Sequence, residues 1–349
     1  MILVKRALIV ALAARAVLLG AAGCDVDVPL ANPPVVDPPV ATPPVATPPV
    51  ATPPVDAPVH VLASGLDWPS QLVLDDDHAY WINLGVGDIG SVMRVAKSGG
   101  DPELLATQPG FPVSLVVDDE AVYWTVSSTQ PGGGAVMRVA KAGGTPVAVV
   151  VGLNWPSELA QDADSLYWRD ELSGVESVAK RGGVPSVLVP GDTLSSGLAV
   201  DRGRVYFEDF AAGTISSVAT TGGPVTQIAS VAHSDIGFFV VDGDVVYWHV
   251  DLVGSVMQVA IAGGTPSVLY PADDELGYFV VTSDAVYVTE KGEIPEMPPG
   301  PRAVERITRT GDARTQITPL AAGNWGLAVD AENVYWTNSS TGTLSAVAR

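Results

Sequence analysis

One pattern of hydrophobic and polar positions recurs seven times along the chain after residue 58. Each copy has a short apolar run ending in an acidic or polar residue, two or three loop residues, an aromatic pair, a polar loop, another apolar-polar run, a Gly-Gly or similar turn and a last short apolar run. The pairs begin 39 to 48 residues apart. They are Tyr80-Trp81, Tyr123-Trp124, Tyr167-Trp168, Tyr206-Phe207, Tyr247-Trp248, Tyr287-Val288 and Tyr335-Trp336. Self-similarity at this period indicates a repeat architecture.

Each copy is interpreted as four β-strands. The first strand, as in residues 72–75 and 327–330, is apolar at successive positions, so both of its faces are expected to be buried. The second carries the aromatic pair, which suits a pleated buried surface. The third alternates, as in 91–97, and Gly pairs such as Gly99-Gly100 supply the positive φ of a hairpin before a short fourth strand. A four-stranded antiparallel unit of this length is a propeller blade, so we predict an all-β, seven-bladed propeller. A β-sandwich would not repeat at one period, and the repeat of a β-helix is shorter.

The two ends of the repeat region complement each other. The seventh copy stops at Ala348-Arg349 after its third strand, and residues 58–63 resemble the fourth strands of the other copies. We therefore predict that 59–63 pairs with 343–348 and closes a propeller domain that spans 59–349. Closure would remove two sheet edges that otherwise invite aggregation.

The first 24 residues have the grammar of an export signal. A basic start is followed by an apolar stretch, small residues and Cys24, the only cysteine of the chain. Ala21-Ala22-Gly23-Cys24 resembles the lipobox of bacterial lipoproteins, which implies cleavage before Cys24 and lipidation of its thiol. The alternative is simple cleavage that leaves a free thiol. The resemblance places the protein at the bacterial cell envelope, facing the periplasm or the exterior and held to the membrane only by its lipid; it leaves open which membrane.

Residues 25–58 are rich in proline and contain three copies of Pro-Pro-Val-Ala-Thr. Because proline fixes φ and lacks a backbone donor, we expect neither helix nor sheet here, only extended polyproline II. At about 3.1 Å per residue the segment would reach on the order of 100 Å, so it is interpreted as a spacer. The alternative is a proline-rich ligand for a partner domain.

Charge narrows the classes of partner. The chain has 39 acidic and 18 basic residues, a net charge of −21. Such a charge repels nucleic acid and attracts cationic ligands, although it also simply keeps an exported protein in solution. With one cysteine, no disulfide can form within a chain, and stability must come from the core. We expect a monomer.

The aromatic signature, clearest at Tyr335-Trp336-Thr337-Asn338, resembles the YWTD propeller repeat of low-density-lipoprotein receptors. It is also similar to exported bacterial propellers related to the NHL and senescence-marker-protein (SMP-30) groups. The resemblance covers 59–349 and implies a propeller fold, not a particular ligand.

Candidate ligand-binding residues lie in the loops that enter the first strand of each copy. Trp68, Phe111 and Trp155 occupy equivalent places in three successive copies, beside acidic loops. We expect a site at the top of the central channel for a saccharide, a cation, a peptide or a protein. The alternative is that the aromatic residues plug the channel end. The candidate residues are Trp68, Phe111, Trp155, Asp235, Glu275 and Trp325.

Two sets of polar residues recur in register. One follows the aromatic pair by two positions, as at Asp170 and Asn338, and the other ends the first strands, as at Asp75 and Asp330. Both are interpreted as partners for turn N–H groups rather than as a functional ring.

The sequence gives little support for catalysis. Only four histidines are present, and no HExxH, GxSxG, Walker or Cys/His cluster occurs. The first hypothesis is therefore a non-enzymatic binding or scaffold module without a cofactor, and a structural partner in an envelope complex is another. The alternative is a metal-dependent hydrolase or lyase with one Ca- or Mg-type ion in the channel. An SMP-30-like lactonase would use Glu158, Asp235 and Glu275, and a relative of streptogramin-inactivating lyases would use His233 with Glu275.

Overall fold

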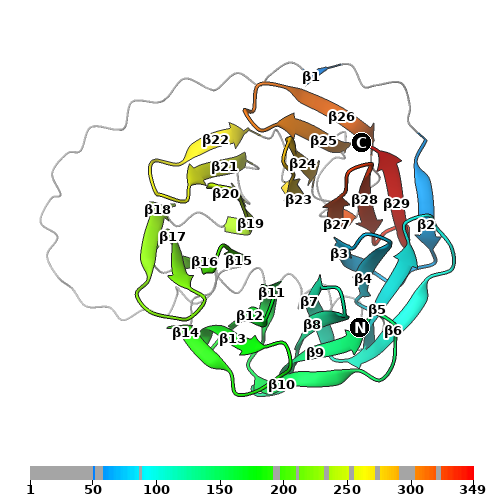
Figure 1. The fold of residues 1–349 in the computed structure, drawn as a ribbon. Coiled ribbons are helices and arrows are strands. Elements are labelled where there is room, and N and C mark those ends of the chain that lie inside the picture. Colours follow the sequence, from blue (N-terminus) through cyan, green and yellow to red (C-terminus); the bar gives the residue numbers. More distant parts are fainter. Residues whose placement is uncertain are drawn as a thin grey trace, which may run out of the picture. The chain divides into compact units, whose positions relative to one another are not determined.

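Seven antiparallel sheets follow one another along the chain and surround a common centre in the computed structural model (Figure 1). The structure describes residues 50–51, 58–85, 89–191, 197–209, 212–231, 236–250, 255–271, 276–290, 303–319 and 324–349, and no helix occurs among them. The predicted all-β, seven-bladed propeller of four-stranded antiparallel blades is confirmed.

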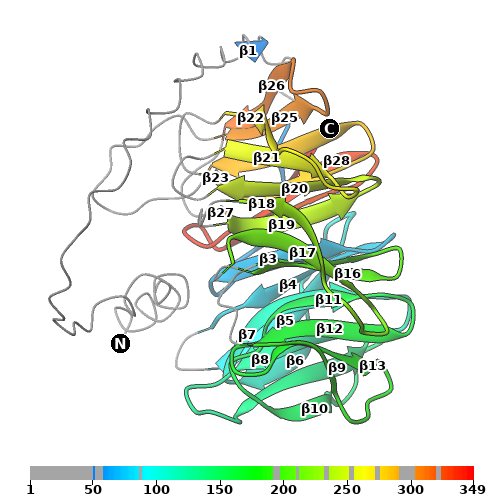
Figure 2. The same ribbon diagram turned by 90° about the vertical axis from the view of Figure 1, so that its left-hand side faces the viewer.

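The first six blades run from the centre outward in chain order (Figure 1), and Figure 2 shows the same blades from the side. Blades 1 to 3 consist of β3 (Pro69–Leu74), β4 (His78–Asn83), β5 (Ile89–Ala96) and β6 (Glu103–Pro109); β7 (Phe111–Val117), β8 (Ala121–Ser127), β9 (Gly134–Ala140) and β10 (Val147–Leu153); and β11 (Ser157–Gln161), β12 (Ser165–Asp170), β13 (Gly174–Ala179) and β14 (Ser186–Pro190). Blades 4 to 6 consist of β15 (Leu198–Asp201), β16 (Arg204–Asp209), β17 (Thr214–Ala219) and β18 (Thr226–Ser230); β19 (Ile236–Asp242), β20 (Val245–Val250), β21 (Ser255–Ala260) and β22 (Ser267–Tyr270); and β23 (Leu276–Val281), β24 (Ala285–Glu290), β25 (Ala303–Thr308) and β26 (Arg314–Pro319).

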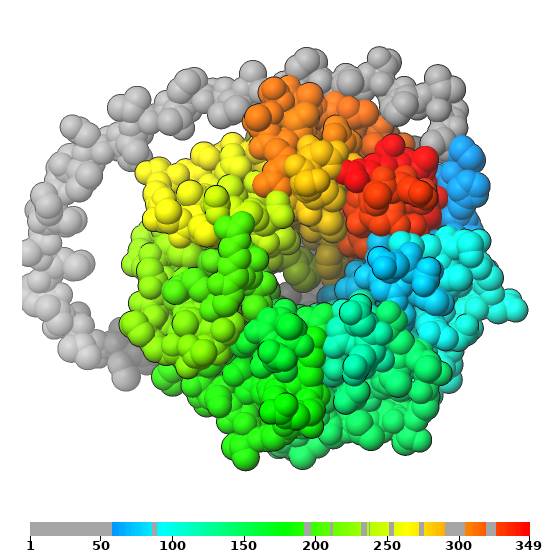
Figure 3. Space-filling model, in the orientation of Figure 1, coloured from blue at the N-terminus to red at the C-terminus, as the bar shows by residue number. Residues whose placement is uncertain are grey.

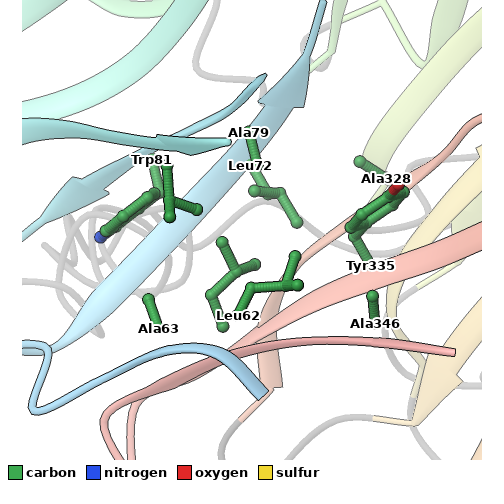
Figure 4. Close-up of a cluster of buried hydrophobic side chains, with 10 residues drawn as sticks. Leu62, Ala63, Leu72, Ala79, Trp81, Ala328, Tyr335 and Ala346 are labelled. Atoms are coloured by element: carbon green, nitrogen blue, oxygen red, sulfur yellow. The ribbon is translucent and has the colours of Figure 1, made fainter. Parts of the chain in front are cut away.

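The seventh blade is built from both ends of the propeller. Its strands β27 (Asn324–Val329), β28 (Asn333–Asn338) and β29 (Thr343–Ala348) are completed by β2 (His60–Ser64). His60 pairs with Ala346 and Ser64 with Thr343. The predicted closure by the strand at 59–63 is confirmed. Figure 4 shows Leu62 and Ala63 of β2 in one buried cluster with Trp81 of blade 1 and Tyr335 of blade 7.

The aromatic pairs form the cores between blades. Because successive side chains of a strand point to opposite faces, each blade sends its tyrosine toward the next blade and its second aromatic residue toward the preceding one. Tyr80 packs in one buried cluster with Trp124, and Tyr123 packs with Trp168. The same pairing recurs at the other junctions, with Val288 in place of the second aromatic residue in blade 6, and ends with Tyr335 and Trp81 at the closure. One blade alone would expose both aromatic faces, so the ring is needed to bury them.

Part of the proline-rich segment joins a sheet. The short strand β1 (Val50–Ala51) runs parallel to β26 on the outer edge of blade 6, which makes a five-stranded sheet. The expectation that no residue of 25–58 enters a sheet was wrong for these two residues. Unlike the prolines of their copy, Val50 and Ala51 carry backbone N–H groups that can pair in a sheet.

Candidate functional site

Two tryptophans in the loops that enter the innermost strands have an unusual backbone conformation. Trp68 and Trp155 have φ of 57° and 48°, in the left-handed region, and both side chains are half-exposed. Each immediately precedes a buried proline, Pro69 or Pro156. The predicted equivalence of these two residues therefore extends to their conformation. Phe111 also precedes a proline, but it is the first residue of β7 and pairs with Ser127, so it lies in a strand rather than in a loop.

Neighbouring blades hold these entrances in place. A Cβ atom on Gly134 of β9 would lie 2.4 Å from Cδ of Pro156, so only glycine allows the proline after Trp155 to pack there. A Cβ atom on Gly90 of β5 would likewise lie 2.6 Å from Cδ of Pro112. The residue before Trp155 is fixed as well, because the Asn154 N–H donates to Asp170 Oδ2 at 2.6 Å. The aromatic side chains thus stand on a rigid support.

Five blades carry one side chain each at a bulge in the innermost strand, and we call these five positions the channel wall. Each of these residues stands four positions before the Asp or Thr at the end of the innermost strand, where the pairing with the second strand shifts register. The five residues are all half-buried: Gln71, Ser114, Glu158, Phe238 and Tyr278. Phe238 and Tyr278 stack with ring centroids 4.6 Å apart. Figure 3 shows the hollow at the centre of the ring, where these strands meet.

Glu158 is the only acid among these five residues. Burial raises the pKa of Glu158, against the hydrogen bond that the Ser157 hydroxyl donates to Oε2 at 2.6 Å and the charge of Arg169. Burial, followed by the charge of Glu158, raises the pKa of Tyr278. Glu158 lies in blade 3 and Tyr278 in blade 6. These five positions thus supply one carboxyl group and two stacked rings.

A buried polar position beside this wall was missed by the sequence analysis. The residue directly after each aromatic pair is Thr125, Arg169, Glu208, His249, Thr289 or Thr337 in six blades, and all six are buried. The signal in the sequence is that the position directly before the recurrent polar site is itself polar in six blades.

Several of these side chains satisfy the backbone of the innermost strand. Thr289 Oγ1 accepts the Tyr278 N–H at 3.0 Å, and His249 Nδ1 accepts the Phe238 N–H at 3.2 Å. Arg169 Nη1 donates to the main-chain oxygen of Glu208 at 3.1 Å. Burial lowers the pKa of Arg169 from its ordinary value, and the opposing charges of Glu158, Glu208 and Asp209 offset this shift only in part. In blades 5 and 6 the position therefore supports the bulged innermost strand, whereas Arg169 bonds to β16 of the next blade.

The other two polar sets have the turn-supporting contacts predicted for them. Asp170 Oδ1 accepts the N–H groups of Leu172 and Ser173, and Asn338 Oδ1 accepts those of Ser340 and Thr341. At the strand ends, Asp75, Asp118, Asp162 and Asp330 each accept two turn N–H groups. Asn83 differs, because its Oδ1 accepts the Trp81 indole N–H at 2.9 Å.

The remaining sequence candidates lie outside the described part of the chain. This holds for Asp235, Glu275, His233 and Cys24, and for the side chain of Trp325, whose backbone belongs to β27. Within the described residues, no three His, Cys, Asp or Glu side chains are grouped to hold a metal ion. The part of the chain that the structure describes contains no helix long and apolar enough to cross a membrane.

Comparison with known proteins supports the fold alone. No family model and no curated protein matches the sequence. Virginiamycin B lyase from Staphylococcus aureus is similar in structure, with a TM-score of 0.67, 11% identity and coverage of 84% of this chain and 99% of the lyase. A catalytically inactive histidine-to-alanine variant of that lyase with quinupristin has a TM-score of 0.66, 11% identity and coverage of 84% and 100%. A nidogen/laminin complex has a TM-score of 0.51 and 17% identity, covering 74% of this chain and 92% of the matched chain.

Proposed function

We propose that this chain is a binding protein without catalytic activity that holds its ligand at the top of the central channel. The observation that carries the proposal is the left-handed backbone of Trp68 and Trp155. A bulky residue in that region costs on the order of 1–3 kcal/mol, and such strain concentrates at functional sites. Both side chains are half-exposed, so burial in the core does not offset this cost fully.

The chemistry of the wall indicates the class of ligand. Indole and phenol faces stack on the apolar faces of sugar rings and attract cations. Glu158 adds a carboxyl group, a hydrogen-bond acceptor, to the set of bulge residues that includes Phe238 and Tyr278. The net charge of −21 favours cationic ligands on approach. We therefore propose a saccharide or a cationic peptide as the ligand.

Tryptophan fluorescence tests this proposal on the full chain. The probes are a panel of neutral oligosaccharides and a panel of Lys- and Arg-rich peptides. We expect one panel to bind, Trp155→Ala and Trp68→Ala to weaken that binding at least about tenfold, as loss of an aromatic anchor does, and Trp155→Phe to weaken it less. Equal binding by wild type and both alanine variants would refute the assignment of the site.

We also propose that Cys24 carries lipid and anchors the protein to a bacterial envelope. The proposal rests on the lipobox-like Ala21-Ala22-Gly23-Cys24 and on the proline-rich segment that follows it. A protein with several acyl chains at one end is held stably at a membrane. Metabolic labelling with a radioactive fatty acid should mark the wild type and not Cys24→Ser, and only the wild type should sediment with membranes. Equal labelling of both would contradict lipidation at this residue.

A lyase or hydrolase that depends on a divalent metal is the second candidate function. It is favoured by the similarity to virginiamycin B lyase, which extends over 99% of that chain. Metal analysis of the purified protein, together with an assay of quinupristin turnover with and without Mg²⁺, separates the two candidates. Turnover that requires the ion would replace the binding proposal, and absence of both metal and turnover would favour it.

A further inference from the structure

The outer edge of blade 6 differs from the other six outer edges. The outermost strands of the other blades, β2, β6, β10, β14, β18 and β22, all begin with two exposed residues. Exposed apolar side chains lie there, such as Val61 at 59% and Leu104 at 59%. The first residues of β26, Arg314 and Thr315, are instead half-buried.

The strand β1 lies on this edge. Val50 pairs with Arg314 and Ala51 with Thr315, in parallel. An extended peptide that adds a strand to a free sheet edge gains affinity from main-chain hydrogen bonds. The edge of blade 6 is therefore covered by a segment that contains few donors.

The side chain of Arg314 turns back against its own and the preceding blade. It forms an ion pair with Glu305 of β25 at 3.1 Å, and its guanidinium lies 5.5 Å from the ring centre of Tyr270 in β22. Glu305 also accepts the Tyr270 hydroxyl at 2.8 Å. The arginine is thereby held on the propeller.

The docked residues belong to the last of three identical Pro-Pro-Val-Ala-Thr copies, at 38–42, 43–47 and 48–52. In every copy only Val, Ala and Thr carry a backbone N–H, so each copy offers the same short stretch able to pair. Recognition through the backbone cannot distinguish these copies chemically. Only the length of chain back to β2 does so.

We propose that the edge of β26 is a docking site for the extended Val-Ala-Thr units of the chain's own repeat, and that each of the three copies satisfies it. Eight residues separate Ala51 from His60, and the corresponding lengths for the other two copies are 13 and 18. Because a longer loop costs more closure entropy, docking of the copies at 43–47 and 38–42 is disfavoured by only about 2-fold and about 3-fold relative to the copy at 48–52. The repeat acts as an adjustable strap. A shift by one copy changes the free length toward Cys24 by five residues, about 15 Å when extended. This proposal does not depend on the ligand at the channel.

Hydrogen exchange of the β26 amides in the full chain tests the strap. Val50→Pro with Ala51→Pro removes the donors of one copy and keeps the proline-rich character. The same change in all three copies gives a six-residue variant. We expect the two-residue variant to lose only about 2-fold protection, because the next copy replaces the first, and the six-residue variant to lose most of it. Amides of β6, an edge strand that β1 does not touch, serve as the control for intact folding.

A synthetic peptide of three Pro-Pro-Val-Ala-Thr copies should restore protection to the six-residue variant. Unchanged protection in that variant would overturn docking, and complete loss in the two-residue variant would overturn the equivalence of the copies. Protection in the wild type should not change with protein concentration. A rise with concentration would show that the repeat of a second molecule occupies the edge, which would overturn the assignment to the chain's own repeat.

Discussion

The ammonium group of Lys97 in blade 1 donates a 2.9 Å hydrogen bond to Oδ2 of Asp330 in blade 7. The pair spans the junction at which β2 closes the ring. Equivalent pairs link Lys141 to Asp75 and Lys180 to Asp118, at 2.5 Å and 2.9 Å. In each case a base after the third strand of one blade reaches the acid that ends the innermost strand of the preceding blade. The acids expected to support turns therefore also connect neighbouring blades.

Lys97→Met should destabilise the propeller, and more so at neutral than at acidic pH. Burial acts to raise the pKa of Asp330, but hydrogen bonds from Lys97, from two turn N–H groups and from the Tyr335 hydroxyl outweigh it and lower that pKa to about 2. A depressed pKa contributes stability above the unfolded value of about 4, and the contribution disappears as the pH falls through about 2. Because the pair is partly exposed, we expect a loss of about 1 kcal/mol at pH 7.

Urea denaturation from pH 7 to pH 2 measures this effect, and Asp330→Asn with the double variant completes a mutant cycle. A coupling energy of zero at pH 7, or a loss that is the same at pH 2, would show that the ion pair is not the cause.

Two junctions lack the cation, because the residue after the third strand is Thr220 in blade 4 and Ile261 in blade 5, and supplying it in blade 5 should stabilise the ring. The place held by Lys in blades 1 to 3 is Ile261 in blade 5, opposite Asp201 of blade 4. Asp201 Oδ2 is buried and accepts no hydrogen bond from the described residues, although Nε of the adjacent Arg202 lies 3.5 Å away. Since a lysine stem can replace part of the isoleucine packing, Ile261→Lys should raise the free energy of unfolding by about 0.5–1 kcal/mol. The gain should be absent in an Asp201→Asn background, and a gain that persists there would exclude the proposed pairing.

Closure of the ring predicts different costs for two adjacent residues of β2. Leu62 is 9% exposed and packs at the junction of blades 7 and 1, whereas Val61 is 59% exposed. Leu62→Ala should lower the free energy of unfolding by about 2–3 kcal/mol, because it leaves a cavity. Val61→Ala should change it by less than about 0.5 kcal/mol. Thermal or urea denaturation of the two variants decides the matter, and equal costs would mean that β2 does not seal the core.

The repeat made the fold predictable, because the tyrosine and its aromatic neighbour alternate between two faces and both faces need a cover. The closure followed from a missing strand at one end and a spare strand at the other. The polar contacts between blades could not be predicted from the sequence. Lys97 and Asp330 are far apart in the sequence, and only the ring geometry brings them together. The left-handed φ of Trp68 and Trp155 was also hidden, since tryptophan gives no signal for that conformation. The strand at Val50 was missed because prolines were taken to exclude all pairing.

Gly134→Ala should both destabilise the protein and disturb the ligand site. The new Cβ would lie 2.4 Å from Pro156 Cδ and 2.9 Å from the Leu153 carbonyl oxygen, so the entrance that carries Trp155 must move. We expect a cost of about 1–3 kcal/mol and weaker binding of the probe that the wild type accepts. Gly143→Ala is the control, because its Cβ meets nothing within 4 Å and only the positive φ of 85° is strained. Should both variants bind the probe equally, the packing of Pro156 does not set the position of Trp155.

Trp155→Gly separates a functional tryptophan from a structural one. Glycine accepts the left-handed conformation without the penalty of about 1–2 kcal/mol that a side chain incurs, and this relief opposes the loss of a half-buried indole. We therefore expect the free energy of unfolding to change by less than about 1 kcal/mol. Probe binding should fall at least about tenfold, as it does when an aromatic anchor is removed. Trp168→Gly in the same blade is the matched control: its indole is fully buried, and its loss should cost more than about 3 kcal/mol. If Trp155→Gly proved as costly as Trp168→Gly, packing alone would account for the strained tryptophan, and the principal support for a ligand at the channel entrance would be lost.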